Sequence, residues 1–528
     1  MNRFLSLLLL SLAVCLFVFQ AQAQNATISG KVLDAATTKP IEGAVISNGK
    51  QQTTSGSTGA FSIAAAKGSQ LTVSFVGYSS RKITVTGADL TISLNPSADQ
   101  LNEVVVTALG VKKETKKLGY SVQEVKGSDL VKAREVNPVN GLVGKVAGLD
   151  VAINQEMLSA PNVSLRGYNI SLYVIDGIPV TSDTWNLSPD DIESYTVLKG
   201  LAATAIYGSR AQNGAILITT KKAKKNDKGY TIEFNSSTQV NKGFIALPKT
   251  QTQYGGGDYS QYIFGDGKGG GLNDGDYDVW GPALNGQLIP QYNSPIDPVS
   301  GKRKATPYLP VGVDNLKRFI EAGVLTTNNL SFASSTDRSN VRMSLTNTYQ
   351  KGIIPNTKLN TINFNMNASY NLSDKLKIEG TLNYNRQMSP NIPDVSYGPN
   401  SVIYTMTVWT GADWNIADMR NYWQPGKEGV QSVFAEYQRY HNPYFMSYEW
   451  LRSHNKNDIT GNIALTYKAN SHLEAILRTN ISANDVMRTE KMPYSAHPYG
   501  RELNRGDYRE DQRSLFDNNV EGLSLIHI

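Results

Sequence analysis

Four carboxylates lie close together between residues 171 and 222: Asp176, Asp190, Asp191 and Glu193. Paired carboxylates can serve acid–base catalysis, but this chemistry also needs a base or a nucleophile within hydrogen-bond reach. No such partner accompanies them in this segment, and all five histidines lie at position 441 or later. We therefore expect structural or salt-bridge roles for these carboxylates. We predict no catalytic residues and no enzyme.

Asp274, Asp276 and Asp278 have the spacing with which a calcium-binding loop begins. An EF-hand loop also needs a glycine at its sixth position and a glutamate at its twelfth. Val279 and Asn285 occupy those two positions, which excludes an EF-hand. Residues 25–97 contain no cluster of zinc ligands, and we predict no metal and no cofactor.

The lysines gather in two clusters, at 112–117 and 221–228, although the formal net charge of the 528 residues is only +6. A nucleic-acid-binding patch would combine such charge with interleaved aromatic residues and a matching fold. The two clusters instead flank a single segment, so we interpret them as solvated linkers. We expect no nucleic-acid partner.

The N-terminus has the features of a secretory signal peptide, predicted over residues 1–23. Arg3 precedes an almost wholly apolar run, 4–19, and Ala21-Gln22-Ala23 forms an A-x-A cleavage site. Lipid attachment at Cys15 is the alternative, but Val14 is bulky where a small residue is expected. Cleavage would remove the only cysteine, and with it any disulfide or thiol chemistry.

No later stretch is apolar enough for a transmembrane helix, so membrane insertion would require a β-barrel, the other structure that satisfies its backbone in lipid.

Residues 24–97 are predicted to form a small β-sandwich. Short β-rich runs alternate there with Gly, Asn, Ser and Lys turns. The runs are 27–33, 43–47, 71–76, 82–85 and 90–94.

Residues 101–108, with the sequence LNEVVVTA, follow the sandwich. Three consecutive valines between a flexible approach and a lysine-rich exit favour an extended strand. An exposed strand can add itself to the edge of a partner's sheet, with main-chain hydrogen bonds supplying the affinity.

The segment 171–222 alternates short strands with tight turns. Residues 173–175 are predicted to form a buried strand that ends in a turn made by Asp176-Gly177 and Pro179. The Ala-rich run 201–206 suits a short helix, with Gly208 as its C-cap. Asn213-Gly214 forms a turn before a last strand, 215–220.

After residue 228 the pattern changes to long strands with one apolar and one polar face, which is typical of a transmembrane β-barrel. Eight strands are predicted, at 230–241, 325–335, 340–350, 359–372, 376–387, 458–468, 472–484 and 514–522. The links after strands two, four and six are short, those after strands one, five and seven are long, and the link after strand three is intermediate. Bacterial barrels alternate periplasmic turns and outer loops in this way, whereas a soluble sandwich has no reason to do so.

Several motifs resemble the SusC/RagA family of TonB-linked outer membrane proteins. SLYVIDGIPV (171–180) and DDIESYTVLKGLAATAIYGSRAQNGAILITTKK (190–222) resemble the family's plug signature, as do GLVGKVAGL (141–149) and NVSLRG (162–167). The resemblance assigns 24–97 to a carboxypeptidase-regulatory-like domain, 101–108 to the TonB box, 115–222 to the plug and 229–522 to a partial barrel.

The resemblance also implies which residues matter. TonB would bind Glu103, Val104, Val105, Val106, Thr107 and Ala108. The plug signature residues are Arg166, Gly167, Tyr173, Val174, Ile175, Asp176, Gly177, Pro179, Lys199, Tyr207, Gly208, Arg210, Asn213 and Gly214.

The family resemblance implies active import of oligomeric nutrients, glycan oligosaccharides or peptides, across the outer membrane of a Gram-negative bacterium. The expected partners are TonB with its ExbB/ExbD-energised complex, a SusD-like surface lipoprotein, outer membrane lipid and the transported ligand. The N-terminal domain would be periplasmic. The alternative is an outer-membrane receptor or adhesin that binds its ligand without transporting it.

Eight strands are too few to surround the predicted plug, because side chains fill the interior of a barrel of that size, and plugged transporters have about 22 strands. The fold class expected is therefore mainly β: a sandwich, an α/β plug and the first part of an antiparallel barrel. Residues 523–528 can be encoded by CTGTCTCTTATACACATC, a transposon end used in sequencing libraries. We expect the native sequence to continue differently after Gly522.

Overall fold

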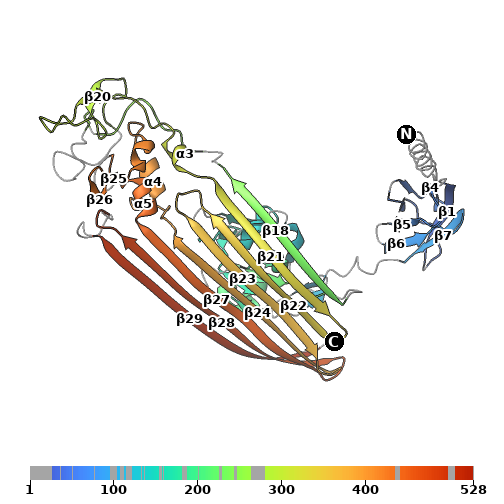
Figure 1. Ribbon diagram of the computed structural model, residues 1–528. Coiled ribbons are helices and arrows are strands. Elements are labelled where there is room, and N and C mark those ends of the chain that lie inside the picture. The colour runs from blue at the N-terminus through green and yellow to red at the C-terminus, as the bar shows by residue number, and fades with distance from the viewer. Residues whose placement is uncertain are drawn as a thin grey trace, which may run out of the picture. The chain divides into compact units, whose positions relative to one another are not determined.

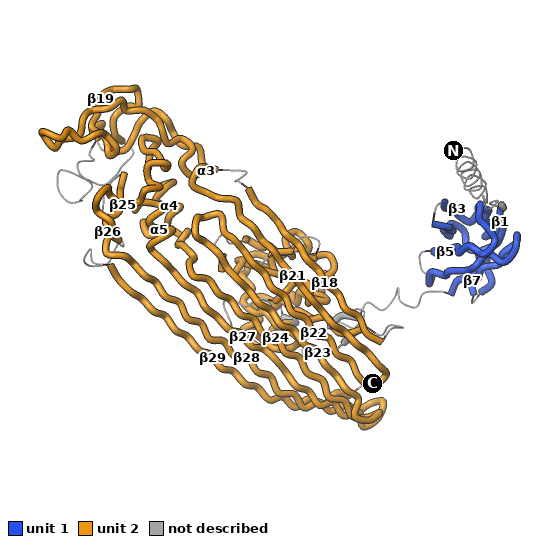
Figure 2. The backbone as a smooth tube through the Cα atoms, in the orientation of Figure 1, with its two compact units in different colours: residues 1–105, 112–119 blue, residues 106–111, 120–528 orange. Residues whose placement is uncertain are grey.

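A computed structural model describes residues 26–526. Residues outside it or in its gaps are 1–25, 36, 50, 76–77, 96–103, 107–111, 115–121, 132–133, 136, 154–156, 159, 181–186, 200, 225–228, 243–246, 258, 263–279, 409, 435–440, 497–505 and 527–528. The predicted signal peptide lies outside the described residues, as do Glu103, Thr107 and Ala108 of the predicted TonB box. The chain divides into two compact units, residues 1–105 with 112–119 and residues 106–111 with 120–528 (Figure 2).

The first unit is a two-sheet β-sandwich, as predicted. One sheet has the order β4-β1-β7, in which β1 and β7 run parallel, and the other has the order β3-β2-β5-β6. The alternating apolar residues of both sheets form a buried core. The strands are β1 (Ala26–Asp34), β2 (Val45–Ser47), β3 (Gln52–Thr54), β4 (Ala60–Ala65), β5 (Gln70–Ser74), β6 (Arg81–Thr84) and β7 (Asp89–Leu94).

Two short strands follow the sandwich. The valines of the predicted TonB box form β8 (Val104–Val106), and β8 forms a two-stranded sheet with β9 (Lys112–Glu114). The extended strand expected from three consecutive valines is therefore present.

The plug begins the main part of the second unit. Its central sheet has the order β10-β16-β17-β14-β15, and a smaller sheet has the order β11-β12-β13. One hydrophobic core spans both. The strands are β10 (Val122–Lys126), β11 (Leu149–Ala152), β12 (Asn162–Leu165), β13 (Tyr168–Asn169), β14 (Leu172–Ile175), β15 (Ile178–Pro179), β16 (Ile192–Leu198) and β17 (Ala215–Thr220). The helical turns are η4 (Gly127–Asp129), η5 (Pro138–Leu142), η6 (Pro189–Asp191), α2 (Leu201–Tyr207) and η7 (Gly208–Ala211).

Eight long strands form one antiparallel sheet in chain order, here called the barrel sheet (Figure 1). They are β18 (Tyr230–Asn241), β21 (Gly323–Ser335), β22 (Ser339–Lys351), β23 (Lys358–Asn371), β24 (Leu376–Asn391), β27 (Leu451–Lys468), β28 (Leu473–Met492) and β29 (Asp507–Ile526). All eight predicted strands are confirmed. The sheet is open, with β18 and β29 as its two edges.

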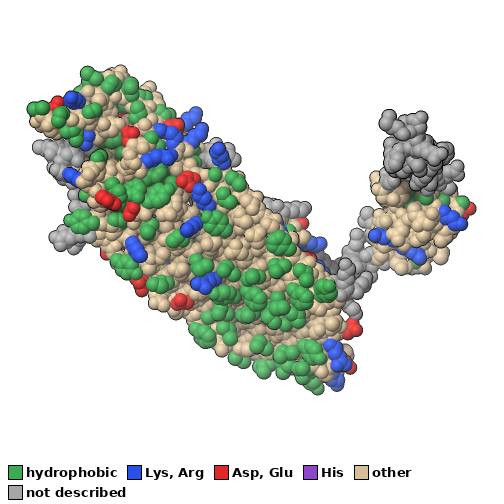
Figure 3. Space-filling model, viewed as in Figure 1, with side chains coloured by type: hydrophobic (Ala, Val, Ile, Leu, Met, Phe, Trp, Pro, Cys, Tyr) green, Lys and Arg blue, Asp and Glu red, His purple; other side chains and the backbone are tan. Residues whose placement is uncertain are grey.

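The polarity of the two faces of the barrel sheet is the reverse of that in a soluble protein: apolar side chains are exposed and polar side chains are buried. Leu345 is 52% exposed, whereas Thr346 beside it is fully buried. The strand register places Leu345 in a row with apolar residues on most neighbouring strands, and Thr346 in a row of polar residues. Figure 3 shows hydrophobic side chains gathered on the outer face, toward the end with the short turns. This is the face pattern of a transmembrane barrel.

Several strands are longer than predicted. β27 begins at Leu451 rather than at 458, β28 continues to Met492, and β29 spans Asp507–Ile526 and so crosses the predicted boundary at 522. Strands of 18 to 20 residues rise about 60 Å, roughly twice the hydrocarbon thickness. Beyond the lipid both faces are polar, so the alternation that reveals a strand disappears while the backbone ladder continues.

The two longest links fold into a layer of their own, here called the loop cap, at the end of the sheet away from the short turns (Figure 1). Its core includes the stacked rings of Trp414 and Phe434, whose centroids lie 3.9 Å apart. The elements are β19 (Leu288–Pro290), β20 (Ala305–Pro307), α3 (Asn315–Phe319), α4 (Val402–Thr407), η9 (Ile416–Arg420), β25 (Trp423–Gln424), β26 (Lys427–Gln431) and α5 (Pro443–Tyr448). None of the helices among the described residues is both long and apolar enough to cross a membrane.

Candidate functional site

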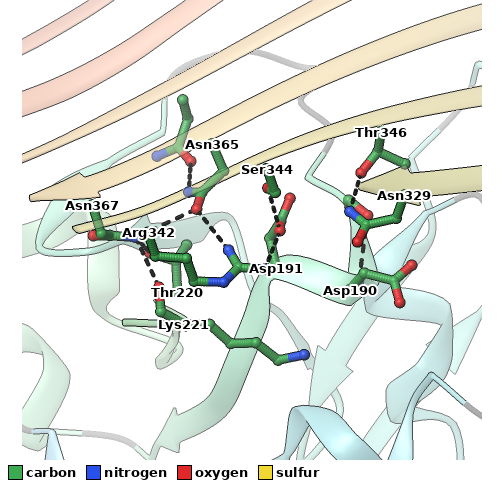
Figure 4. A network of polar contacts seen from close by, with 12 residues as sticks. Asp190, Asp191, Thr220, Lys221, Asn329, Arg342, Ser344, Thr346, Asn365 and Asn367 are labelled. Atoms are coloured by element: carbon green, nitrogen blue, oxygen red, sulfur yellow. Dashed lines mark hydrogen bonds and ion pairs between the residues drawn. The ribbon is translucent and has the colours of Figure 1, made fainter. Parts of the chain in front are cut away.

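The plug lies against the polar face of the barrel sheet, and the two are joined by side-chain hydrogen bonds and a buried ion pair (Figures 1 and 4). On the barrel side the residues are polar because inward positions of the strands face the plug instead of lipid. We take this polar interface as the candidate functional site, since it holds the plug in place.

Asp191 forms a buried ion pair across the interface. It ends the short helix η6, whose start is fixed by Pro189 and by the Ser188 side chain, which accepts from the Asp190 amide. Arg342 of β22 donates to Asp191 Oδ1 at 2.8 Å, and Ser344 Oγ donates to the same oxygen at 2.5 Å. The side chains of the pair are 0% and 6% exposed, for Asp191 and Arg342 respectively. Burial raises the pKa of the Asp191 carboxyl, whereas Arg342 and Ser344 oppose that shift.

The carboxylate of the neighbouring Asp190 turns the other way and binds within the plug. Its two oxygens accept hydrogen bonds from Arg134 at 2.8 and 3.0 Å, a bidentate ion pair. This contact raises the pKa of the Arg134 guanidinium. The backbone oxygen of Arg134 in turn accepts from Gln239 of β18. Asp190 and Asp191 thus tie the same short helix to the plug core and to the barrel wall.

Asp176 connects the plug signature to the wall by a second route. Its Oδ1 accepts from the Thr220 amide at 2.9 Å and its Oδ2 from the Thr220 hydroxyl at 2.7 Å. The Thr220 hydroxyl accepts from Asn367 of β23 at 2.7 Å, and the Asp176 backbone oxygen accepts from Asn462 of β27 at 3.1 Å. Burial raises the pKa of the Asp176 carboxyl, while the Thr220 hydrogen bonds lower it.

Two motifs of the signature are two-residue hairpin turns. Arg166-Gly167 joins β12 to β13, and Asp176-Gly177 joins β14 to β15. All four residues have positive φ, between 49° and 88°, as a type I′ turn requires. The predicted turn at Asp176-Gly177 is confirmed, and the Arg-Gly motif proves to be a turn as well.

Most of the other predicted signature residues make their contacts within the plug, although Ile175 also lines a small cavity with Asn383 and Asn385 of the wall. Val174 and Ile175 are buried in the strand predicted for them, next to Tyr173, whose phenol has a pKa raised to about 12 by burial. Gly208 follows α2 with φ of 67°, the C-cap expected. The remaining contacts are Lys199 Nζ to the Ala147 oxygen, Asn213 Nδ2 to the Asn169 oxygen, and Ser171 Oγ to the Arg210 oxygen. Pro179 pairs with Val174, and Gly214 (φ 108°) precedes β17. Tyr207, the last residue of α2, is half-buried.

The four carboxylates from which catalysis could have been argued are all engaged structurally, as predicted. Asp190 and Asp191 form buried ion pairs, Asp176 binds Thr220, and Glu193 forms an exposed pair with Lys224. Within the described residues, no three His, Cys, Asp or Glu side chains are grouped to hold a metal ion.

The barrel half of the site was not predicted. Its residues come from β18, β22, β23 and β27, and their only signal in the sequence is the polar phase of the strand alternation. Besides Arg342 and Ser344, they include Asn340, which both accepts from and donates to the Ala223 backbone, and Asn365, which accepts from Arg342.

Comparison with known proteins agrees with this architecture. Residues 28–106 match the model of the CarboxypepD_reg-like domain, and residues 114–215 match that of the TonB-dependent Receptor Plug Domain. The chain is 33% identical over 288 residues to TonB-dependent receptor SusC of Bacteroides thetaiotaomicron, which covers 50% of this chain and 28% of that protein. A TonB-dependent receptor of Formosa agariphila is 31% identical over 222 residues, covering 40% and 21%.

Among solved structures, the RagAB peptide importer in the open-open state has a similar fold. The TM-score is 0.58 at 18% identity, covering 80% of this chain and 46% of that one. The closed-closed state of the same importer gives a TM-score of 0.54, with 77% and 45% covered. The chain thus aligns with less than half the length of each of these proteins.

Proposed function

We propose that this chain, which belongs with the SusC/RagA-type TonB-dependent receptors, takes part in active import of oligomeric nutrients across the outer membrane. The nutrients would be glycan oligosaccharides or peptides. TonB, energised by its ExbB/ExbD complex, would supply the force, and a SusD-like surface lipoprotein would deliver the ligand. The N-terminal unit would lie in the periplasm.

The observation that carries this proposal is the polar interface between plug and barrel wall. Groups such as Asn340, Asn367 and Asn462 can exchange their hydrogen bonds to the plug for hydrogen bonds to water, at a net cost of about 0.5–1.5 kcal/mol each. An apolar interface would lose far more on separation, and its exposed wall would repel a polar oligomer. A polar wall therefore suits a plug that moves and a passage that hydrated ligands cross.

The order of the plug strands indicates which part of the plug a force applied by TonB would reach first. β10 is the first plug strand after the predicted TonB box and is an edge of the central sheet, where it pairs with β16 alone. Its last residue, Lys126, lies opposite Ser194, three positions after Asp191. Force applied at 103–108 would strip β10 first and would then act beside the ion pair of Asp191 with Arg342.

The Val104–Val106 strand suits capture by TonB through strand addition, in which main-chain hydrogen bonds supply the affinity. In this mechanism the chain performs no chemistry on the ligand. A receptor that binds without transport is the alternative, and an intact TonB box in the sequence argues against it.

The test is deletion of residues 103–108 in the full-length protein, assayed in cells. We expect uptake to be lost while surface binding of ligand is retained. A matched control replaces the same six residues by another Val-rich sequence of β-propensity, which main-chain capture should partly tolerate. Undiminished uptake after the deletion would contradict the proposal.

A further inference from the structure

A cavity of about 740 Å³ lies between the plug, the loop after β24 and the last three strands of the barrel sheet. Leu158 and Ala160 of the plug line one side of it, and Pro393 and Asn400 line another. The barrel wall contributes side chains of β27, β28 and β29. A ligand held in this cavity would therefore touch the wall and the plug together.

The strand register makes this part of the wall rich in arginine. Residues directly opposite in neighbouring antiparallel strands share a face. One row of the wall contains His454, Arg488 and Asp511, and the next contains Arg452, Glu490 and Arg509. Arg513 follows on the same face of β29. Four arginines and two carboxylates from these strands thus line the cavity.

Two of the four arginines are already neutralised. Arg452 forms ion pairs with Asp394 at 3.1 Å and with Glu490 at 2.8 Å, and Arg513 forms one with Asp511 at 3.0 Å. Among the described residues, no carboxylate lies within ion-pair distance of Arg488 or Arg509. Arg452 and Arg513 therefore show that arginines of this wall bind carboxylates. Arg488 and Arg509 line the same cavity without a carboxylate partner among the described residues.

Arg488 is held toward the cavity by the buried side chain of His454. Its Nε donates to His454 Nδ1 at 3.4 Å, so Nδ1 acts as the acceptor and the imidazole proton resides on Nε2. His454 Nε2 then donates to Gln387 Oε1 at 3.1 Å. These hydrogen bonds use only the Nε–H of the Arg488 guanidinium. Its two terminal nitrogens remain able to donate a pair of parallel hydrogen bonds to a carboxylate.

We propose that Arg488 and Arg509 bind a carboxylate group of the transported ligand, so that this protein selects acidic oligomers. The inference rests on the proposed import function and names the chemical class of its ligand. The carboxylate could belong to a uronic-acid sugar or to an acidic peptide, and both present the same planar group to the guanidinium fork.

The experiment measures binding to the full-length protein, purified from outer membranes in detergent, without TonB. The probes are a hexamer of galacturonate and a hexapeptide of glutamate, each compared with an uncharged counterpart, maltohexaose and hexaserine. We expect an acidic probe to bind more tightly than its uncharged counterpart, and more weakly as salt rises. Which acidic probe binds identifies the source of the carboxylate.

The variants Arg488→Gln and Arg509→Gln should each weaken binding of the acidic probe about tenfold, because a hydrogen bond to a charged group is lost. Arg488→Lys should retain part of the affinity, since it keeps the charge but not the fork. Arg338→Gln is the matched control: it removes the same charge from an exposed turn between β21 and β22 and should change nothing.

Equal binding of acidic and uncharged probes would overturn the inference, as would unchanged affinity in both glutamine variants with circular dichroism and melting temperature intact. Since the binding assay contains no TonB and measures no transport, these outcomes leave the import proposal standing. Conversely, arginine-dependent binding combined with uptake that survives deletion of 103–108 would overturn the import proposal alone.

Discussion

Arg342 of the barrel wall and Asp191 of the plug form an ion pair at 2.8 Å from which water is almost wholly excluded. They are 151 residues apart in the sequence, and each also has a second partner, Ser344 for Asp191 and Asn365 for Arg342. Removing one member of a buried pair leaves the other charge uncompensated, whereas an exposed pair contributes little. The contact therefore fixes the position of the plug against the wall.

Asp191→Asn should loosen the plug by about 3–5 kcal/mol, because Arg342 would remain buried without its counter-charge. Hydrogen exchange of residues 189–198 in the full-length protein should accelerate, while the N-terminal sandwich should keep its protection. Glu193→Gln is the control. Its exposed pair with Lys224 is worth about 0.5 kcal/mol or less. Unchanged exchange in Asp191→Asn would contradict the positioning role.

Tyr422 should make the loop cap sensitive to alkaline pH. Burial, together with a 2.8 Å hydrogen bond to Glu449, raises the pKa of its phenol to about 12 from the ordinary 10. The folded cap thus holds the proton more tightly than the unfolded chain does. The stabilisation is complete below pH about 10 and is lost as pH rises toward 12.

The measurement compares the wild type with Tyr422→Phe. The melting temperature of the wild type should be the higher one at pH 9, and the difference should vanish as pH approaches 12. The absorbance at 295 nm should assign a midpoint near 12 to the tyrosine that the variant lacks. A constant difference in melting temperature across this range would show that Tyr422 has an ordinary pKa.

Local sequence predicted those parts of the fold that depend on neighbouring residues. The turn at Asp176-Gly177 could be predicted because Asp-Gly is one of the few residue pairs that tolerate a positive φ at both positions. The strand that contains Leu345 and Thr346 was recognisable because lipid and plug impose opposite polarity on alternate side chains. The unusual exposure of Leu345 is the structural counterpart of that pattern.

Contacts between distant segments could not be predicted in this way. Nothing near Asp191 indicates that its partner is Arg342, because the register of the plug against the wall depends on every strand between them. The outer part of β27, from Arg452 to Asn457, is polar on both faces and so resembled a loop. The cavity arginines were missed for the same reason, since they lie in strand extensions beyond the alternating pattern.

Gly127 should tolerate no side chain. Gly127 follows β10 directly and begins η4, opposite the start of β16. A Cβ there would lie 1.9 Å from the backbone oxygen of Ile192. Backbone cannot yield as a flexible side chain can, so Gly127→Ala should separate the start of β16 from η4 at a cost of about 1–3 kcal/mol. Faster hydrogen exchange in β10 is the expected readout.

Gly87→Ala serves as the control for Gly127→Ala, since nothing lies within 4 Å of the Cβ that it would add. It should leave exchange in β10 unchanged. If Gly127→Ala also left β10 fully protected, the close approach of η4 to Ile192 would not be a constraint on the plug.

Leu345→Arg distinguishes a lipid-facing sheet from a water-facing one. Leu345 is 52% exposed and lies in one row with Leu330 and Phe364 on the adjacent strands. In lipid, an arginine at the middle of the membrane costs about 2–4 kcal/mol, whereas in water the same change would be nearly neutral. Leu288→Arg, at a position 69% exposed in the loop cap, provides the matched substitution in water. Assembly of the full-length protein into outer membranes should fall for Leu345→Arg and not for Leu288→Arg, and equal assembly of the two variants would refute the assignment of this face to lipid.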